Sequence, residues 1–169
     1  MKLNNFAKLA TGVVISELAG VIGSVFTAPS IPTWYAGIVK PTFNPPAWVF
    51  GPVWTTLFAF MGIAVSLVYI KDEKKALSEV EGRRLKRGKR VALTLFGIQL
   101  ALNIFWSIIF FGLHSPGAAL FEIVFLWLAI VATIIAFSKI SKPAAWLLLP
   151  YILWVSFAMY LNYSIYALN

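Results

Sequence analysis

Few side chains in this sequence are of the types that enzymes use for chemistry. There is no cysteine, and the one histidine, His114, has no Cys, Asp or Glu beside it. Thiol nucleophiles, disulfides and cysteine-ligated zinc are therefore excluded, and we expect His114 to be an ordinary loop residue. Glu17 and Glu122 fall inside apolar stretches, but nothing in the sequence pairs them. The sequence predicts no metal site and no acid–base pair for catalysis.

Aromatic and amide side chains recur at helical spacing in three apolar stretches. The faces that they form are Gly51, Trp54 and Phe58; Gln99, Asn103, Trp106, Ser107 and Phe110; and Tyr151, Trp154, Ala158 and Leu161, with Asn162 beside the last. Such faces are typical of a pocket for a flat, mostly apolar ligand. They are equally typical of helices packed on one another with amides as interhelical hydrogen bonds. Spacing alone leaves both interpretations open.

The composition indicates which elements must position these faces. Of the 169 residues, 60% are hydrophobic and 12% are charged, whereas soluble domains carry about 25% charged residues. A soluble enzyme and a disordered chain are therefore excluded. Stretches long enough to span a bilayer occur at residues 6–27, 46–70, 91–113, 117–138 and 143–167. The sequence predicts an all-α integral membrane protein whose single domain, residues 1–169, is a bundle of five transmembrane helices.

The first stretch admits more than one interpretation. Its basic start and the small residues near Ala28 resemble a cleaved signal peptide, but its length favours an uncleaved helix. Small residues at a spacing of four allow close helix packing, within the protein or between copies. These are Gly12, Ser16, Gly20 and Ser24. We expect Glu17 to make a structural hydrogen bond, with a proton-coupled role as the alternative.

The distribution of charge predicts the orientation. Residues 71–90 carry nine Lys or Arg and four Asp or Glu, and with five spans this loop shares one side with Lys8 and Lys139. The other side carries Lys40 alone. The positive-inside rule then places the N-terminus and the 71–90 loop in the cytoplasm and the C-terminus outside. We expect the membrane to be the cell membrane. The basic run resembles a nucleic-acid patch, but its position favours anionic lipid headgroups of the bilayer, and we expect no nucleic-acid partner.

The connection between the first two spans, residues 28–45, has a different character. Its prolines restrict the backbone, so the loop is expected to be structured rather than floppy. They stand at positions 29, 32, 41 and 45. Trp34, Tyr35 and Phe43 in the same loop allow two interpretations: a lid over the bundle, or an aromatic belt at the membrane interface.

Three segments carry a more specific pattern. They are WYAGIVKPTFNPPAWVFGPVWTTLF (34–58), QLALNIFWSIIFFG (99–112) and AAWLLLPYILWVSFAMYLNYSIYALN (144–169). In content and order they resemble the TspO/MBR family of tryptophan-rich sensory proteins and translocator proteins. The resemblance covers nearly the whole chain after the first helix. It implies a five-helix bundle, often a homodimer, with a ligand pocket between the helices and under the first loop.

The resemblance also implies the ligands: tetrapyrroles such as protoporphyrin IX and haem, and benzodiazepine- or isoquinoline-type drugs. No cofactor is required, because the porphyrin or haem is the ligand itself. Carried over position by position, the ligand-binding residues are Tyr35, Pro45, Trp54, Phe58, Asn103, Trp106, Trp154 and Ala158. All except Tyr35 and Pro45 belong to the faces that spacing selects. Sterol binding at the C-terminus is not expected, because no Lys or Arg follows Tyr163.

Three functions follow as hypotheses. The first is a membrane receptor or sensor for tetrapyrroles that regulates or transports them. The second is enzyme-like, light-dependent porphyrin degradation, with Trp54 and Trp154 as the reactive groups. The third is a transporter, which the lack of a visible inverted repeat does not favour.

Overall fold

The structure is a computed structural model that describes residues 4–71 and 79–169. Within these ranges, five helical segments are long and apolar enough to cross a membrane. In chain order they are α1 (Asn5–Ser30), α3 (Ala47–Ile70), α4 (Glu79–Ser107) continued by the π-helix η2 (Ile108–Gly112), α5 (Pro116–Ser138), and α6 (Lys142–Trp146) followed by α7 (Leu149–Leu168). A short helix, α2 (Trp34–Gly37), lies between α1 and α3. No strand occurs in the described ranges. The prediction of an all-α, multi-pass integral membrane protein is confirmed.

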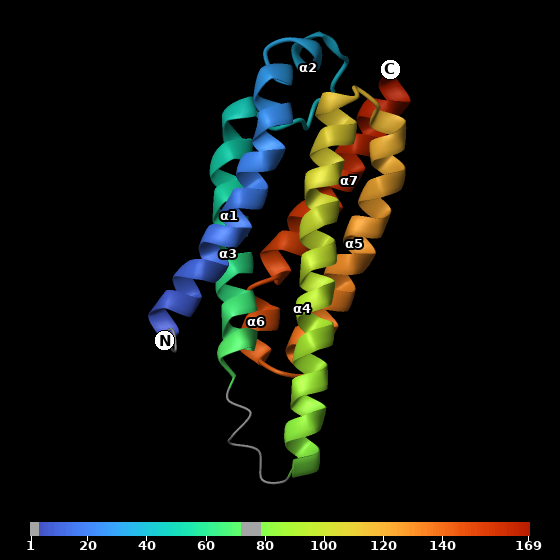
Figure 1. Cartoon of the computed structure of the whole chain (residues 1–169). Coiled ribbons are helices and arrows are strands. Elements are labelled where there is room, and N and C mark those ends of the chain that lie inside the picture. Colours follow the sequence, from blue (N-terminus) through green and yellow to red (C-terminus); the bar gives the residue numbers. More distant parts are fainter. Residues whose placement is uncertain (1–3, 72–78) are drawn as a thin grey trace.

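The helices form one elongated bundle (Figure 1). α1 packs along α3 and α4, while α5 packs between α4 and α7. The N-terminal end of α1 and the beginning of α4 lie toward one end of the bundle, and α2 and the C-terminus lie at the other (Figure 1). The fold therefore places the basic beginning of α4 at one end of the bundle and the loop that carries Lys40 at the other (Figure 1).

Glycine brings α1 and α3 into backbone contact. A Cβ atom added to Gly62 would lie 2.4 Å from the Cα atom of Val13, and one added to Gly12 would lie 2.6 Å from the carbonyl oxygen of Gly62. Ser16, one turn after Gly12, is fully buried. Of the two interpretations of the small-residue stripe, the structure supports packing within the chain.

The third span begins earlier than predicted. Residues 79–90, which the sequence interpretation assigned to a 71–90 loop, are the first turns of α4, and residues 72–78 lie outside the described ranges. Charge keeps these turns out of lipid but does not prevent a helix, because Lys, Arg and Leu are good helix formers. Glu79 and Glu81 in the first turn also favour the positive end of the helix dipole. A hydropathy criterion detects only the apolar part of such a helix.

The fifth span is interrupted, whereas the prediction was one continuous helix over residues 143–167. α6 ends at Trp146, and α7 begins at Leu149. The interruption precedes Pro150, which stands in the first turn of α7. Proline lacks an amide N–H and its ring collides with the carbonyl four residues earlier, so a helix tends to restart at proline rather than pass through it.

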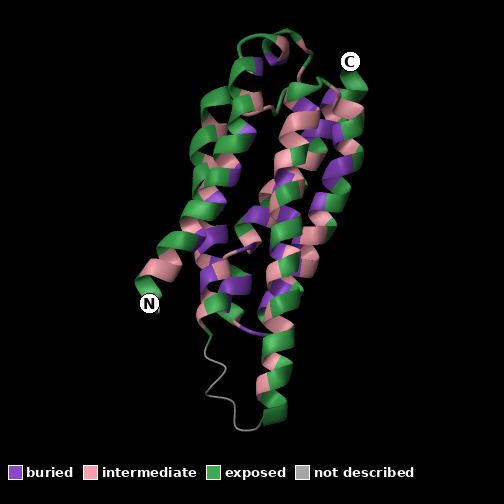
Figure 2. Cartoon of the chain, in the orientation of Figure 1, coloured by how far each residue is buried: buried purple, intermediate pink, exposed green. Residues whose placement is uncertain are grey.

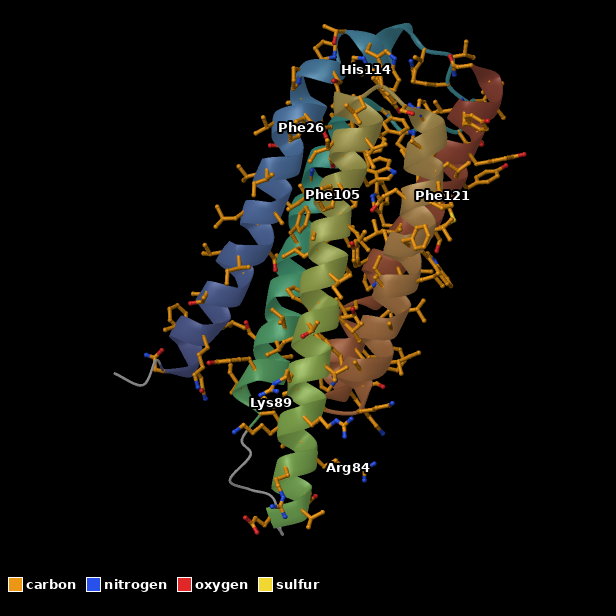
Figure 3. All side chains as sticks on the ribbon, turned by 45° about the vertical axis from the view of Figure 1, so that its right-hand side comes forward. Phe26, Arg84, Lys89, Phe105, His114 and Phe121 are labelled. Atoms are coloured by element: carbon orange, nitrogen blue, oxygen red, sulfur yellow. The ribbon has the colours of Figure 1, made fainter. Side chains whose placement is uncertain are left out.

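Apolar side chains cover the outside of the bundle. The exposed positions follow the outer faces of the helices, and the buried ones lie between the helices (Figure 2). Phe105 and Phe121, which are 54% and 71% exposed, project outward from α4 and α5 (Figure 3). Trp48 at the start of α3 and Trp146 in α6 are 75% and 68% exposed. Exposed tryptophans near the ends of membrane-spanning helices are typical of the membrane–water interface.

Candidate functional site

A cavity of about 470 Å³ lies within the half of the bundle that carries α2. Its walls come from α1, α3, α4 with η2, and α7, and Tyr35 of α2 contributes from the loop. Most of the lining is apolar or aromatic, with few polar groups among it. Ligand sites in proteins typically have this volume and this composition.

Seven of the eight residues that the sequence resemblance assigned to a pocket line this one cavity. They are Tyr35, Trp54, Phe58, Asn103, Trp106, Trp154 and Ala158. Pro45 is not part of the lining. Its carbonyl oxygen instead accepts a 3.0 Å hydrogen bond from the Asn44 amide, so Pro45 contributes to the loop above the cavity.

The α3 wall is aromatic and is held against two other helices. The rings of Trp54 and Phe58 lie 5.6 Å apart, and Trp54 meets Tyr151 of α7 edge-to-face at 6.2 Å. Phe58 is buried against Gly20 of α1, where an added Cβ would lie 2.6 Å from the Phe58 ring. Phe58 therefore occupies space that exists only because residue 20 is glycine.

The α4 wall combines amides with aromatic rings. Asn103 donates a 3.1 Å hydrogen bond from its side-chain amide to the hydroxyl oxygen of Tyr151. The Trp106 indole donates to the side-chain oxygen of Asn162 at 3.2 Å, and Asn162 donates in turn to the carbonyl oxygen of Pro116 at 2.8 Å. These bonds fix both amides and the Trp106 ring, as expected for polar groups away from water.

The π-helix η2 adds further rings to this wall. Its wide turn is closed by the bond from the Leu113 amide to the carbonyl oxygen of Ile108, at 2.8 Å. The hydroxyl of Ser30 in α1 donates to the carbonyl oxygen of Phe111 at 2.7 Å. Phe110 stacks on Trp106 at 5.0 Å, and Phe110 and Phe111 both line the cavity. A π-turn thus orients two adjacent phenylalanines toward one space.

The α7 wall centres on Trp154. Its ring contacts Phe50 of α3 at 6.1 Å and Phe157 at 5.5 Å. The indole Nε1 is buried and has no hydrogen-bond partner among the described residues. An unpaired donor that is shielded from water is costly, and a ligand acceptor in the cavity would relieve that cost.

The loop between α1 and α3 closes the end of the cavity. The Tyr35 hydroxyl donates to the Asn44 side-chain oxygen at 2.6 Å, and burial raises the pKa of the Tyr35 phenol. The Lys40 ammonium donates to the carbonyl oxygens of Tyr35 and Ile38 at 2.7 and 2.8 Å. The Asn169 side chain pairs with both the amide and the carbonyl of Val39, each at 3.0 Å.

Aromatic stacking also fixes the loop to the bundle. The Trp34 ring stacks on His114, with ring centroids 4.6 Å apart, and Phe43 stacks on Tyr160 at 5.1 Å. His114 lies in the turn after η2, the expected loop position, with a positive φ of 51°. Because Tyr35 is buried and lines the cavity, the geometry favours a lid over a simple interfacial belt.

The contribution of α1 was not expected from the sequence. Glu17, Gly20, Gly23, Ser24 and Thr27 line the cavity from a helix span without Trp or Tyr. The spacing of small residues could have indicated this wall, because small residues leave room for a ligand as well as for another helix. Glu17 makes no hydrogen bond within the described ranges, in contrast to the structural bond that we expected.

Glu122 lies away from the cavity, in α5. It is 9% exposed, and both of its carboxyl oxygens are without a hydrogen-bond partner in the described part of the chain. No residue of α5 lines the cavity. The two intramembrane glutamates therefore do not belong to one site.

Comparison with known proteins agrees with this arrangement. The model of the TspO/MBR family matches residues 12–168. This chain belongs to the TspO/MBR family. The resemblance that three sequence segments indicated is thereby confirmed over nearly the whole length.

Individual relatives within the family are similar over most of their length. The tryptophan-rich protein TspO of Chlorobaculum tepidum is 47% identical over 161 residues, which is 95% of each chain. The human translocator protein is 40% identical over 153 residues, covering 90% of this chain and 85% of the relative. The tryptophan-rich sensory protein of Cereibacter sphaeroides is 34% identical over 136 residues, or 80% of this chain and 77% of the relative.

Proposed function

We propose that this TspO/MBR family member is a membrane receptor or sensor that binds tetrapyrroles, such as protoporphyrin IX or haem, in the cavity beneath α2. The observation that carries the proposal is the aromatic lining of one cavity by Trp54, Trp106 and Trp154. A macrocycle presents two flat apolar faces, and indole rings offer the largest apolar contact area of any side chain. The name of one relative, a tryptophan-rich sensory protein, supports the receptor role.

The polar groups of the cavity would orient the macrocycle. The unpaired Nε1 of Trp154 would donate a hydrogen bond to an acceptor on the ligand. The Asn103 side-chain NH2 group donates one hydrogen bond to Tyr151, and its side-chain carbonyl oxygen would accept one from a pyrrole N–H. Tyr35 closes the site from the lid side. Drugs of the benzodiazepine or isoquinoline type would compete for the same aromatic walls.

A fluorescence titration tests the proposal. Protoporphyrin IX should quench the tryptophan emission of the protein in detergent or lipid discs with saturation. Trp154→Ala should weaken the affinity by roughly tenfold, the equivalent of about 1.4 kcal/mol of lost contact. Trp146→Ala is the matched control, because Trp146 is exposed and lies outside the cavity. Equal affinities for the two variants would reject the site.

Light-dependent porphyrin degradation is the second candidate function. The observation that favours it is that Trp54 and Trp154, two oxidisable indoles, line the same cavity. Under illumination, the absorbance of bound protoporphyrin IX should then decay faster with the unsubstituted protein than with a Trp54→Phe, Trp154→Phe double variant. If the porphyrin absorbance decays equally fast in both proteins at equal occupancy of the site, the degradation function is rejected and the receptor role stands.

We also propose that the chain lies in the cell membrane with the basic end in the cytoplasm. Arg84 and Lys89 project from the end of α4 that is remote from His114 (Figure 3). Lys40 is the one Lys or Arg in the lid and belongs to the opposite end. This asymmetry supports the orientation that the positive-inside rule predicts.

A further inference from the structure

The lid end of the cavity is covered by a loop that several independent contacts hold in place. Tyr35 is only 7% exposed, and its hydroxyl is bonded to Asn44. Lys40 donates to three carbonyl oxygens of the loop, and Asn169 bonds Val39 to the C-terminal end of α7. A ligand that entered through this end would have to break these bonds and displace the loop.

The side of the cavity is open between α1 and α3. We call this opening the lateral mouth. Its rim consists of exposed residues that also line the cavity: Val21, Ser24 and Ala28 of α1, and Trp48, Gly51 and Thr55 of α3. Val21 is 58% exposed and Trp48 is 75% exposed. The cavity that the lid covers at one end therefore reaches the outer surface of the bundle between two helices.

The packing of glycines explains why the opening occurs at this level. In the half of the bundle away from α2, Gly12 and Gly62 bring the backbones of α1 and α3 into contact. Nearer to α2, Gly20 lies against the Phe58 ring, and this contact forms the floor of the lateral mouth. On the α2 side of this contact, a Cβ atom added to Gly51 would meet nothing within 4 Å. α1 and α3 are thus in close contact at Gly62 and at Phe58, and there is free space around Gly51, nearer to α2.

The lateral mouth faces lipid rather than water. Its rim belongs to two helices that are long and apolar enough to span the membrane. Trp48 marks the interface at the start of α3, and Gly51 and Thr55 lie about 5 and 10 Å deeper along the helix at 1.5 Å per residue. On the α1 side, Val21 is flanked by the exposed apolar residues Leu18 and Val25.

We propose that the apolar ligand of the cavity enters and leaves sideways, through the lateral mouth, from the bilayer leaflet on the α2 side, while the lid stays closed. This inference rests on the proposed ligand site. A flat apolar molecule concentrates in the bilayer because transfer of its surface out of water is favourable. The lateral mouth gives such a molecule a path from lipid to the aromatic walls that crosses no water and breaks no hydrogen bond of the lid.

Obstruction of the lateral mouth tests the route. In lipid discs, the rates of association and dissociation of protoporphyrin IX are measured by stopped-flow tryptophan quenching for Gly51→Phe and Ser24→Phe. An obstructed route slows both rates, and we expect roughly a tenfold decrease in each. Simple loss of a contact in the site would instead leave association unchanged and accelerate dissociation. Gly97→Phe is the matched control, because Gly97 is exposed on α4 with open space around it.

A second variant addresses the lid. Asn169→Ala removes both bonds to Val39 and should leave the two rates unchanged if the ligand passes through the lateral mouth. Faster association in Asn169→Ala, or unchanged rates in both obstructed variants, would overturn the lateral route while binding itself stands. Absence of saturable quenching in the unsubstituted protein would overturn the proposed function, and the route with it.

Discussion

The hydrogen bond between Asn103 and Tyr151 links the cavity wall to the interior of the bundle. Tyr151 is fully buried, and its hydroxyl is the acceptor for the Asn103 amide at 3.1 Å. The same ring supports Trp54 edge-to-face. At the scale of single residues, the site is therefore held by side chains behind the lining as well as by the lining itself.

Removal of the Tyr151 hydroxyl should destabilise the protein. Tyr151→Phe keeps the ring beside Trp54 but leaves the buried Asn103 amide without its acceptor, which should cost about 1–2 kcal/mol. The measurement is the free energy of reversible unfolding in mixed micelles. Tyr163→Phe on the same helix is the control, because Tyr163 is 55% exposed and should change stability by less than about 0.5 kcal/mol. Equal stability of the two variants would contradict this account.

Much of the cavity lining could be predicted from the residues. Helical spacing alone selected Trp54, Phe58, Asn103, Trp106 and Trp154, which all line one cavity. Spacing placed Gly20 on a packing face rather than in a pocket, and it did not select Glu17, because what either residue contributes depends on which face of α3 lies opposite. Pro45 was assigned from the family pattern, and the lining does not include it.

At the scale of elements, the contact between α1 and α3 determines both the closed and the open part of their interface. Gly62 sits against the backbone of Val13, whereas nothing sits against Gly51. One pair of helices thus provides a tight crossing and, further along, the lateral mouth. The small residues that allow the crossing are part of what defines the site.

A methyl group at the crossing should separate the two helices. Gly62→Ala places a Cβ atom 2.4 Å from the Val13 Cα atom, and backbone cannot rotate away as a side chain can. We expect a loss of about 1–3 kcal/mol in unfolding free energy, typical of an overpacked interior. Gly97→Ala, with open space around its Cβ, should instead be neutral or stabilising by up to about 1 kcal/mol. Thermal unfolding of both variants in one detergent makes the comparison; a smaller loss for Gly62→Ala than for Gly97→Ala would be inconsistent with the crossing.

The number and type of the elements were predictable, but their ends were not. Hydropathy reports which residues contact lipid, and five spans follow from it directly. It does not report where backbone hydrogen bonds continue into water, so the charged first turns of α4 were assigned to a loop. The break before Pro150 was missed because apolar residues continue through it.

At the scale of the whole molecule, the two ends of the bundle differ in charge. Apart from Lys40 in the lid, the described basic residues lie in the first turns of α1 and α4, at the end of α3, and around the α5–α6 connection. This difference predicts a fixed orientation in the membrane.

Cysteine labelling can measure that orientation cleanly, because the chain has no cysteine of its own. Gly37→Cys lies in the exposed lid, and Gly88→Cys lies in the charged turns of α4. Added Cβ atoms at both positions meet nothing within 4 Å, so both variants should fold. In intact cells an impermeant maleimide should label Gly37→Cys, and it should label Gly88→Cys only after permeabilisation. The reverse pattern would invert the proposed orientation.

If the aromatic cavity binds a tetrapyrrole, a larger side chain within the cavity should exclude the ligand. Ala158 lines the cavity, whereas Ala167 on the same helix is exposed and does not. Protoporphyrin IX is titrated into each variant and its own visible absorbance is followed, with every tryptophan retained. Ala158→Phe should weaken binding by roughly tenfold or more, while Ala167→Phe should bind as the unsubstituted protein does. An unchanged affinity in Ala158→Phe would show that the porphyrin binds elsewhere.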